Sequence, residues 1–197
     1  MADPLTFVPA ALIEKFLERS RLDRYFELLM NQNRVVNLVS RETSREDFNR
    51  MVAESLLPLD FTGTDFSSYL DIGSGGGLPA VPLMLSGIGT DGTHLVERTG
   101  KKARALGEII TGMDLKAKIE PTNFAELHLK RRFNLVTLRY VKLEPRLLDR
   151  ILERLEPGGM FVYYSAPGFK VGSGSAVTRR FVSGQGQAVK SLTIFQK

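Results

Sequence analysis

The stretch Tyr69-Leu70-Asp71-Ile72-Gly73-Ser74-Gly75-Gly76-Gly77-Leu78-Pro79 decides the fold class of this 197-residue chain. An apolar strand over residues 67–72 runs directly into a glycine cluster, and Pro79 opens the helix that follows. Glycines between a strand and a helix let the backbone approach a ligand closely, next to the helix N-terminus. The stretch therefore predicts a ligand-binding turn at the end of the first strand of an α/β sheet.

Strands and helices alternate on the C-terminal side of this turn. The pattern predicts further strands over 93–97, 116–120, 133–138 and 159–165, and helices over 79–87, 100–111, 123–129 and 144–155. Two β-rich segments, 176–183 and 189–196, flank Gly184-Gln185-Gly186 and predict a hairpin, while Gly172-Ser173-Gly174-Ser175 predicts a mobile loop. This alternation favours a mostly parallel sheet with helices on both faces.

The N-terminal side of the turn has a different texture. Apolar residues at helical spacing predict one amphipathic helix over 9–31, and Ser44 with Asp47 predicts the start of a second helix over about 45–57. Residues 60–66 are expected to be a linker. We therefore divide the chain into a helical extension, residues 1–60, packed on a core of residues 61–197, as one structural unit.

Composition excludes several classes of protein. The chain has no cysteine and only two histidines, which excludes a disulfide framework and a thiolate zinc site and argues against a multi-histidine metal centre. No apolar run approaches the ~20 residues of a membrane helix, and the first residues do not form a signal peptide, so we expect a cytoplasmic protein. Residues 61–197 carry 19 Lys and Arg against 12 Asp and Glu. That excess fits an anionic partner such as nucleic acid, although an ordinary solvated surface explains it too.

Two cofactor classes compete for the glycine loop. A dinucleotide fingerprint that starts at Gly73 fails because Leu78 occupies its last glycine position, but a looser form fits Gly75, Gly77 and Ala80. The spacing Asp71-x-Gly73-x-Gly75-x-Gly77 instead suits S-adenosylmethionine (SAM), whose ribose and amino-acid groups need acceptors and close backbone contact. The loop by itself leaves the two open, along with a glycine turn that binds nothing.

A carboxylate and a turn add to this pattern. Glu97 ends the next predicted strand, 20 residues after Gly77, where the ribose-binding acid of a doubly wound sheet is expected. The alternative is a carboxylate that stabilises the N-terminus of the helix after it. Further on, Leu155-Glu156-Pro157-Gly158-Gly159 is similar to a turn common in SAM-dependent methyltransferases.

Several segments together resemble one family. They are Asn37-Leu38-Val39-Ser40, the stretch from Tyr69 to Leu83, Val96-Glu97-Arg98-Thr99-Gly100-Lys101-Lys102, Ala125-Glu126, and Phe133-Asn134-Leu135-Val136-Thr137-Leu138-Arg139. They resemble the GidB/RsmG family, bacterial methyltransferases that modify N7 of a guanine in small-subunit (16S) ribosomal RNA, over roughly residues 10–170. The resemblance implies a Rossmann-like class I fold with a seven-stranded, mostly parallel sheet, SAM as cofactor, and ribosomal RNA or the small ribosomal subunit as partner. We expect a monomer.

The resemblance and the loop chemistry assign candidate roles. The cofactor-binding candidates are Asp71, Gly73, Ser74, Gly75, Gly77, Leu78, Glu97, Ala125, Glu126 and Arg139. The substrate-binding candidates are Asn37, Lys101, Lys102 and Arg139, and no metal site is expected. Arg139 is also the catalytic candidate, because it ends a strand at the edge where ligands gather in an open α/β sheet.

Guanine N7 carries a free lone pair, so its methylation needs positioning rather than a base. We therefore expect Arg139→Ala to depress activity far more than stability, unless the residue forms a surface salt bridge.

The chain also departs from the family pattern. A histidine expected in the second helix is replaced by Met51, and a lysine expected near the end of the fifth strand is replaced around Ser165-Ala166. The alternatives are therefore a methyltransferase for another RNA or a small molecule, a non-catalytic RNA-binding relative, and an NAD-dependent oxidoreductase.

Overall fold

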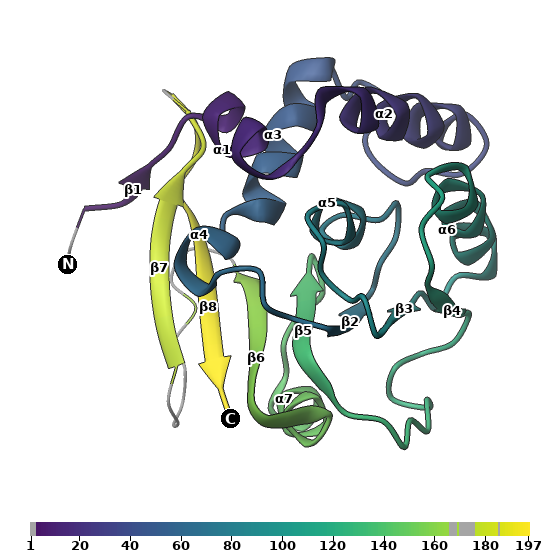
Figure 1. Cartoon of the computed structure of the whole chain (residues 1–197), viewed down its shortest axis with the longest axis vertical. Helices are drawn as coiled ribbons and strands as arrows, with labels where there is room; N and C mark the ends of the chain where they lie inside the picture. The colour runs from purple at the N-terminus through teal and green to yellow at the C-terminus, as the bar shows by residue number, and fades with distance from the viewer. Residues whose placement is uncertain (1–2, 166–168, 170–175, 185) are drawn as a thin grey trace.

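The computed structural model describes residues 3–165, 169, 176–184 and 186–197. Eight strands form one sheet in the order β1-β7-β8-β6-β5-β2-β3-β4 (Figure 1). All neighbouring strands run parallel except at β8, which is antiparallel to both β6 and β7. The strands are β1 (Leu5–Thr6), β2 (Ser68–Ile72), β3 (Gly92–Val96), β4 (Lys118–Glu120), β5 (Phe133–Arg139), β6 (Leu155–Ser165), β7 (Ala176–Val182) and β8 (Lys190–Gln196).

The predicted mostly parallel sheet is confirmed, and so is the pairing of the two C-terminal strands. The seven expected strands are all present. An eighth, the two-residue β1, adds to the edge by pairing Leu5 with Phe181 and Thr6 with Val182. The predicted loop over 172–175 and the replaced position Ala166 lie outside the described residues.

Strand β2 lies in the middle of the sheet, between β3 and β5. All five of its residues are buried, as expected for a parallel strand covered on both faces. Its side chains alternate between two apolar clusters: Tyr69 joins the cluster on one face, and Leu70 and Ile72 join the cluster on the other. The carboxyl end of β2 therefore emerges at the centre of a rigid, buried layer.

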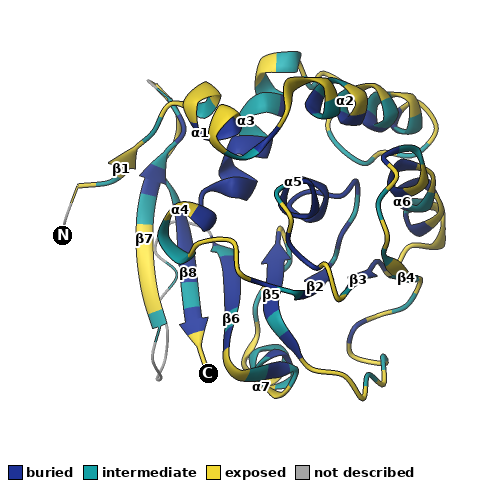
Figure 2. Cartoon of the chain, viewed as in Figure 1, coloured by how far each residue is buried: buried dark blue, intermediate teal, exposed yellow. Residues whose placement is uncertain are grey.

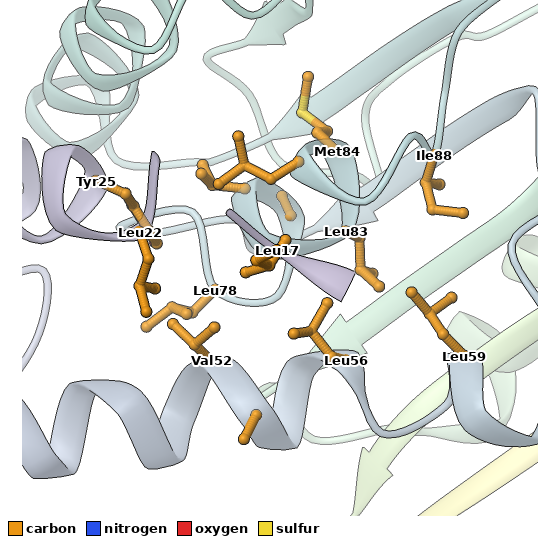
Figure 3. Packing of buried hydrophobic residues seen from close by; sticks show 14 of the residues in the cluster. Leu17, Leu22, Tyr25, Val52, Leu56, Leu59, Leu78, Leu83, Met84 and Ile88 are labelled. Atoms are coloured by element: carbon orange, nitrogen blue, oxygen red, sulfur yellow. The ribbon is translucent and has the colours of Figure 1, made fainter. Parts of the chain in front are cut away.

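Helices cover both faces of the sheet, as predicted (Figure 2). The helices are α1 (Pro9–Phe16), α2 (Arg19–Asn33), α3 (Arg45–Leu56), α4 (Leu59–Thr62), α5 (Ala80–Leu85), α6 (Gly100–Gly112) and α7 (Pro145–Glu153). Helix α7 packs into the smaller cluster, with Leu70 and Val136, while α1, α2, α3, α5 and α6 contribute to the larger one. Figure 3 shows Leu22 of α2, Val52 and Leu56 of α3, and Leu83 of α5 in this larger cluster.

The N-terminal helices share one core with the sheet-covering helices. The buried residues of α1, α2 and α3 belong to the same cluster as those of α5 and α6. The extension therefore lies against the core, whereas the division of the chain at residue 60 stays a prediction.

Three predicted elements are wrong in detail. The helix expected over 9–31 is two helices, because Leu17 and Glu18 adopt extended backbone angles, and both Leu17 and Leu22 still reach the core. The linker over 60–66 begins inside the short helix α4. The short helix expected over 123–129 is a turn, in which Asn123 Oδ1 accepts a hydrogen bond from the Ala125 amide at 3.1 Å. Asparagine favours such local turns over a helix because its side chain competes for backbone donors.

By contrast, the predicted N-terminus of α3 is confirmed, with a reciprocal capping box between Ser44 and Asp47.

Candidate active site

A cavity of about 1010 Å³ opens at the carboxyl ends of β2, β3 and β5. This is the edge at which open α/β sheets bind their ligands. Seven of the candidate residues line it: Gly73, Ser74, Gly75, Leu78, Glu97, Lys102 and Arg139. The structure therefore brings together, in one place, residues spread over 67 positions of the chain.

Backbone hydrogen bonds and positive φ angles shape the sharp turn of the glycine loop. The amides of Gly73 and Ser74 both donate to the carbonyl of Val96, at 2.8 and 3.0 Å, which ties the loop to the end of β3. Gly73, Gly75 and Gly77 have φ angles of 76°, 52° and 90°. Residues with a Cβ rarely adopt these angles, so glycine is required by the turn itself.

Helix α2 holds the loop from behind. The Tyr25 hydroxyl donates to the Gly76 carbonyl at 2.9 Å, and a Cβ added to Gly76 would lie 2.9 Å from Leu29. A Cβ on Gly75, in contrast, would meet only the Gly73 carbonyl oxygen, at 3.8 Å. Gly75 is thus the open point of the loop, and it lines the cavity.

Glu97 is a buried carboxylate at the wall of the cavity. Its Oε2 accepts from the Gly75 amide at 3.0 Å, and its Oε1 accepts from the Thr99 amide at 2.8 Å, at the start of α6. The contact with Thr99 matches the alternative of a carboxylate that stabilises the helix N-terminus, whereas the ribose-binding role of Glu97 stays a prediction. Each carboxylate oxygen has a second lone pair, so Glu97 retains acceptor capacity for a ligand hydroxyl.

Asp71 lies beneath the loop and does not line the cavity. The Tyr69 hydroxyl lies 2.7 Å from the Thr137 hydroxyl, which donates to Asp71 Oδ1 at 2.5 Å. Asp71 Oδ2 is buried without a hydrogen-bond partner among the described residues. Burial raises the pKa of Asp71 to about 6, although the Thr137 hydrogen bond opposes this rise.

Arg139 lines the cavity, but its side chain is 3% exposed and engaged with helix α3. It forms an ion pair with the buried Glu54 at 2.8 Å, and it donates to the Ser55 hydroxyl at 2.9 Å and the Met51 carbonyl at 3.1 Å. The burial of Arg139 contradicts the premise that it contributes little to the core, and it contradicts the surface-salt-bridge alternative, whereas its catalytic role stays a prediction. The cation is a buried connection between β5 and α3.

Other candidates lie outside the cavity lining. Ala125 and Glu126 are exposed in the turn after β4, and Asn37 is exposed, with its Oδ1 accepting from Arg41 Nε at 3.1 Å. Gly77 lies behind the loop, where its Cβ would meet Val81 at 2.6 Å. Lys101 points to solvent while its neighbour Lys102 lines the cavity. Their cofactor and substrate roles stay predictions.

Residues that the sequence analysis did not propose as site residues complete the wall. Leu38, Val39 and Ser40 follow α2, and Asn33 holds them because its Oδ1 accepts from the amides of Leu38 and Val39 at 2.8 and 3.1 Å. The remaining polar and aromatic residues of the wall that were not site candidates are Glu42, Thr43, Asp47, Arg50, Arg98, Thr99, Thr122, Asn123, Phe124, Tyr140, Lys142 and Lys190. A buried asparagine at the end of a helix was an available signal; the others depend on long-range packing.

The cavity carries a cationic rim. Arg50, Arg98, Lys102, Lys142 and Lys190 line it together with only three acidic residues, Glu42, Asp47 and Glu97. A wall of this composition attracts anionic groups.

Among the described residues no group of three His, Cys, Asp or Glu is placed to hold a metal ion. No helix in the part of the chain that the structure describes is long and apolar enough to cross a membrane.

The site fits a cofactor that contains a nucleoside. Its volume suits a ligand of that size, Gly75 leaves the backbone open to close approach, and Glu97 offers acceptor lone pairs at the end of β3. The fit therefore depends on the volume of the cavity and on the polar groups that face it.

Solved structures with low sequence identity share the fold. An O-methyltransferase from Bacillus cereus, solved in complex with SAH, has a TM-score of 0.63 at 14% identity and covers 93% of this chain and 99% of its own. A 16S rRNA N2 G1207 methyltransferase from T. thermophilus, solved with AdoMet and guanosine, has a TM-score of 0.56 at 21% identity over 73% of this chain and 42% of its own. These likenesses establish the class I methyltransferase architecture.

Curated relatives are closer in sequence. Ribosomal RNA small subunit methyltransferase G of Bradyrhizobium diazoefficiens is 39% identical over 111 residues, which cover 55% of this chain and 42% of the relative. The protein of the same name from Chlorobium phaeobacteroides is 32% identical over 143 residues, 72% of this chain and 64% of the relative. The matches thus span about two fifths to two thirds of those relatives. The sequence model of the family described as rRNA small subunit methyltransferase G matches residues 18–170, and the chain belongs to this family, GidB.

Proposed function

We propose that this protein is a SAM-dependent methyltransferase that transfers a methyl group to N7 of a guanine in small-subunit ribosomal RNA. The observation that carries the proposal is the juxtaposition of the open Gly75 backbone and the Glu97 carboxylate in one cavity of a GidB-family chain. We expect it to act as a monomer in the cytoplasm, on ribosomal RNA or the small subunit.

The residues divide into a cofactor side and a substrate side. Gly73, Ser74 and Gly75 would contact the cofactor through the backbone, and Glu97 would accept from its ribose hydroxyls. Asp71 would act through the loop that it supports, since it does not reach the cavity. Lys102 would neutralise phosphates of the RNA, and Arg50, Lys142 and Lys190 would do so in competition with the carboxylates that they already pair with, those of Asp47, Glu144 and Glu54.

SAM supplies an electrophilic methyl group on a positively charged sulfur. The lone pair of guanine N7 forms the new N–C bond, and the electron pair of the breaking C–S bond stays on sulfur. Because N7 carries no hydrogen, no proton has to leave before this step. The protein therefore has to hold the base in line and exclude water, an effect worth several kcal/mol. Arg139 would contribute by joining the end of β5 to α3, two elements that both line the cavity.

Incubation with tritiated SAM and ribosomal RNA from cells that lack the modification tests the proposal. The expected result is label in N7-methylguanosine after nucleoside mapping. Label in a different nucleoside, or in a small molecule, would replace the substrate assignment. SAM binding without any transfer to naked RNA or to the small subunit would favour a non-catalytic RNA-binding relative.

The cofactor has a separate test in a thermal melt. SAM or its demethylated product is expected to raise the melting temperature, whereas NAD is not. At a ligand concentration 100 times the dissociation constant, the free energy of unfolding should increase by about 2.7 kcal/mol. A shift with NADH and none with millimolar SAM would favour the oxidoreductase alternative instead.

Glu97→Ala is expected to raise the dissociation constant for SAM by about 10- to 150-fold. A charged acceptor contributes about 1.5–3 kcal/mol to such hydrogen bonds, and the variant also releases the Gly75 amide from its 3.0 Å contact. Isothermal titration measures the change, with Glu108→Ala as the matched control, because Glu108 is exposed on the same helix α6 that Glu97 precedes. Equal affinities for wild type and Glu97→Ala would remove Glu97 from the cofactor site.

A further inference from the structure

Tyr140 is an aromatic residue that the fold leaves exposed at the cavity. It follows the last residue of β5, it lines the cavity, and it is 77% exposed. Its φ angle is 58°, which bulky residues seldom adopt. Neither burial nor backbone preference explains a tyrosine at this position, and strained residues of this kind gather at ligand sites.

The ring is held by Arg139 instead of by the apolar core. The guanidinium carbon of Arg139 lies 4.9 Å from the Tyr140 ring centroid, and Arg139 Nη2 lies 3.2 Å from the Tyr140 hydroxyl oxygen. Arg139 is itself fixed by Glu54 and Ser55 of the buried helix face. A buried, hydrogen-bonded cation thus contacts an otherwise solvent-exposed ring.

The surroundings of the ring have the chemistry of a nucleic-acid site. Lys142 is two residues away along the chain, and Arg50 and Lys190 line the same cavity. Each of the three also forms an ion pair, with Glu144, Asp47 and Glu54 respectively, which phosphates would have to compete with. Exposed aromatic rings flanked by cations recognise unstacked nucleobases, because the ring stacks on the base while the cations meet the phosphates. A rigid ring loses little entropy when a base is placed on it.

We propose that Tyr140 is the stacking residue for the nucleobase that accepts the methyl group, with Arg139 as the positioning residue that holds the ring. This inference rests on the proposed function, since it names the group that places the base in that reaction. A contact with the adenine of the cofactor would be the competing role, and the experiments below separate the two.

Substitutions that keep or remove the ring test the stacking role. Tyr140→Phe retains the ring and is expected to stay within about threefold of the wild-type KM for RNA. Tyr140→Leu keeps an apolar side chain without a π face, and it is expected to raise that KM by about five- to 150-fold, which corresponds to about 1–3 kcal/mol of base stacking. The dissociation constant for SAM is expected to stay the same in both variants. The urea midpoint should also stay the same, because the side chain is exposed.

Fluorescence gives a readout that does not depend on turnover. The chain contains no tryptophan, so Tyr140→Trp introduces a single reporter at the ring position. Guanosine monophosphate, or a short RNA with an unpaired guanine, is expected to quench its emission in the presence of the demethylated cofactor. Val8→Trp is the control, because Val8 is exposed and does not line the cavity.

The outcomes separate this inference from the proposed function. An unchanged RNA KM for Tyr140→Leu, or Tyr140→Trp emission that is insensitive to RNA that binds, would overturn the stacking role while wild-type methyl transfer stands. A rise in the SAM dissociation constant alone would reassign the ring to the cofactor. Quenching at position 140 without any methyl transfer by the wild type would support stacking of a base on this ring, and it would overturn both the proposed function and the identity of that base as a methyl acceptor.

Discussion

Arg139→Ala is expected to destabilise the protein by about 3–5 kcal/mol, which lowers the melting temperature by about 6–20 °C in a domain of this size. The substitution leaves the Glu54 carboxylate, 1% exposed, without its guanidinium partner. Ser183 and Lys190 still donate to Glu54 Oε1, at 2.7 and 2.6 Å, so we place the loss near the lower end. Urea unfolding followed by circular dichroism measures the change.

A double substitution checks that the loss comes from the buried Glu54 charge, which loses its guanidinium partner in Arg139→Ala. Arg139→Met keeps most of the buried volume, and Glu54→Gln removes the buried charge while its amide oxygen still accepts from Ser183 and Lys190. The combination of the two is expected to be more stable than Arg139→Met alone, because a buried pair costs most when only one partner is removed. A wild-type urea midpoint for Arg139→Met would show that the ion pair does not stabilise the fold.

Asp71 is expected to make the protein less stable as the pH rises. The folded-state pKa of about 6 lies above the usual 3.8, so the folded protein retains a proton that the unfolded chain releases. The free energy of unfolding therefore falls by about 3 kcal/mol as the pH rises through the window from 3.8 to about 6, and the stability present below that window is lost above it.

Asp71→Asn removes this dependence. We expect the stability of the variant relative to wild type to increase by about 2 kcal/mol between about pH 4.5 and about pH 7.5, measured by urea unfolding at both values. Thr137→Val is expected to strengthen the wild-type trend, because the Thr137 hydrogen bond lowers the pKa of Asp71. Parallel pH profiles for wild type and Asp71→Asn would show that Asp71 is ionised equally in both states.

Much of the cavity could be predicted because its signals are local. The glycine spacing from Gly73 to Gly77 reflects the positive φ angles of the turn, which are a local requirement. Glu97 reaches the loop because one helix and one strand of ordinary length separate it from Gly77. The capping box of Ser44 and Asp47 spans three residues, and the structure contains it. The turn at Asn123 was missed since a short polar segment can satisfy its backbone either as a helix or through its own side chains.

Other parts of the site depend on distant pairs. Glu54 and Arg139 are 85 residues apart, and Lys190 reaches the same carboxylate from 136 residues away. Nothing in the spacing of either residue indicates the other, because the contact arises when α3 packs over the ends of β5 and β8. That packing turned a candidate surface cation into a buried one.

The sequence by itself therefore determined the seven main strands, the glycine turn and the acid that faces it, because these follow from hydrophobic periodicity and from the angles that a chain can adopt locally. The tertiary structure decided which side chains become buried, what Arg139 pairs with, and that Tyr140 stands exposed at the cavity beside several cations. Those properties depend on the dielectric surroundings and neighbours of each group, which exist only after the helices have packed against the sheet.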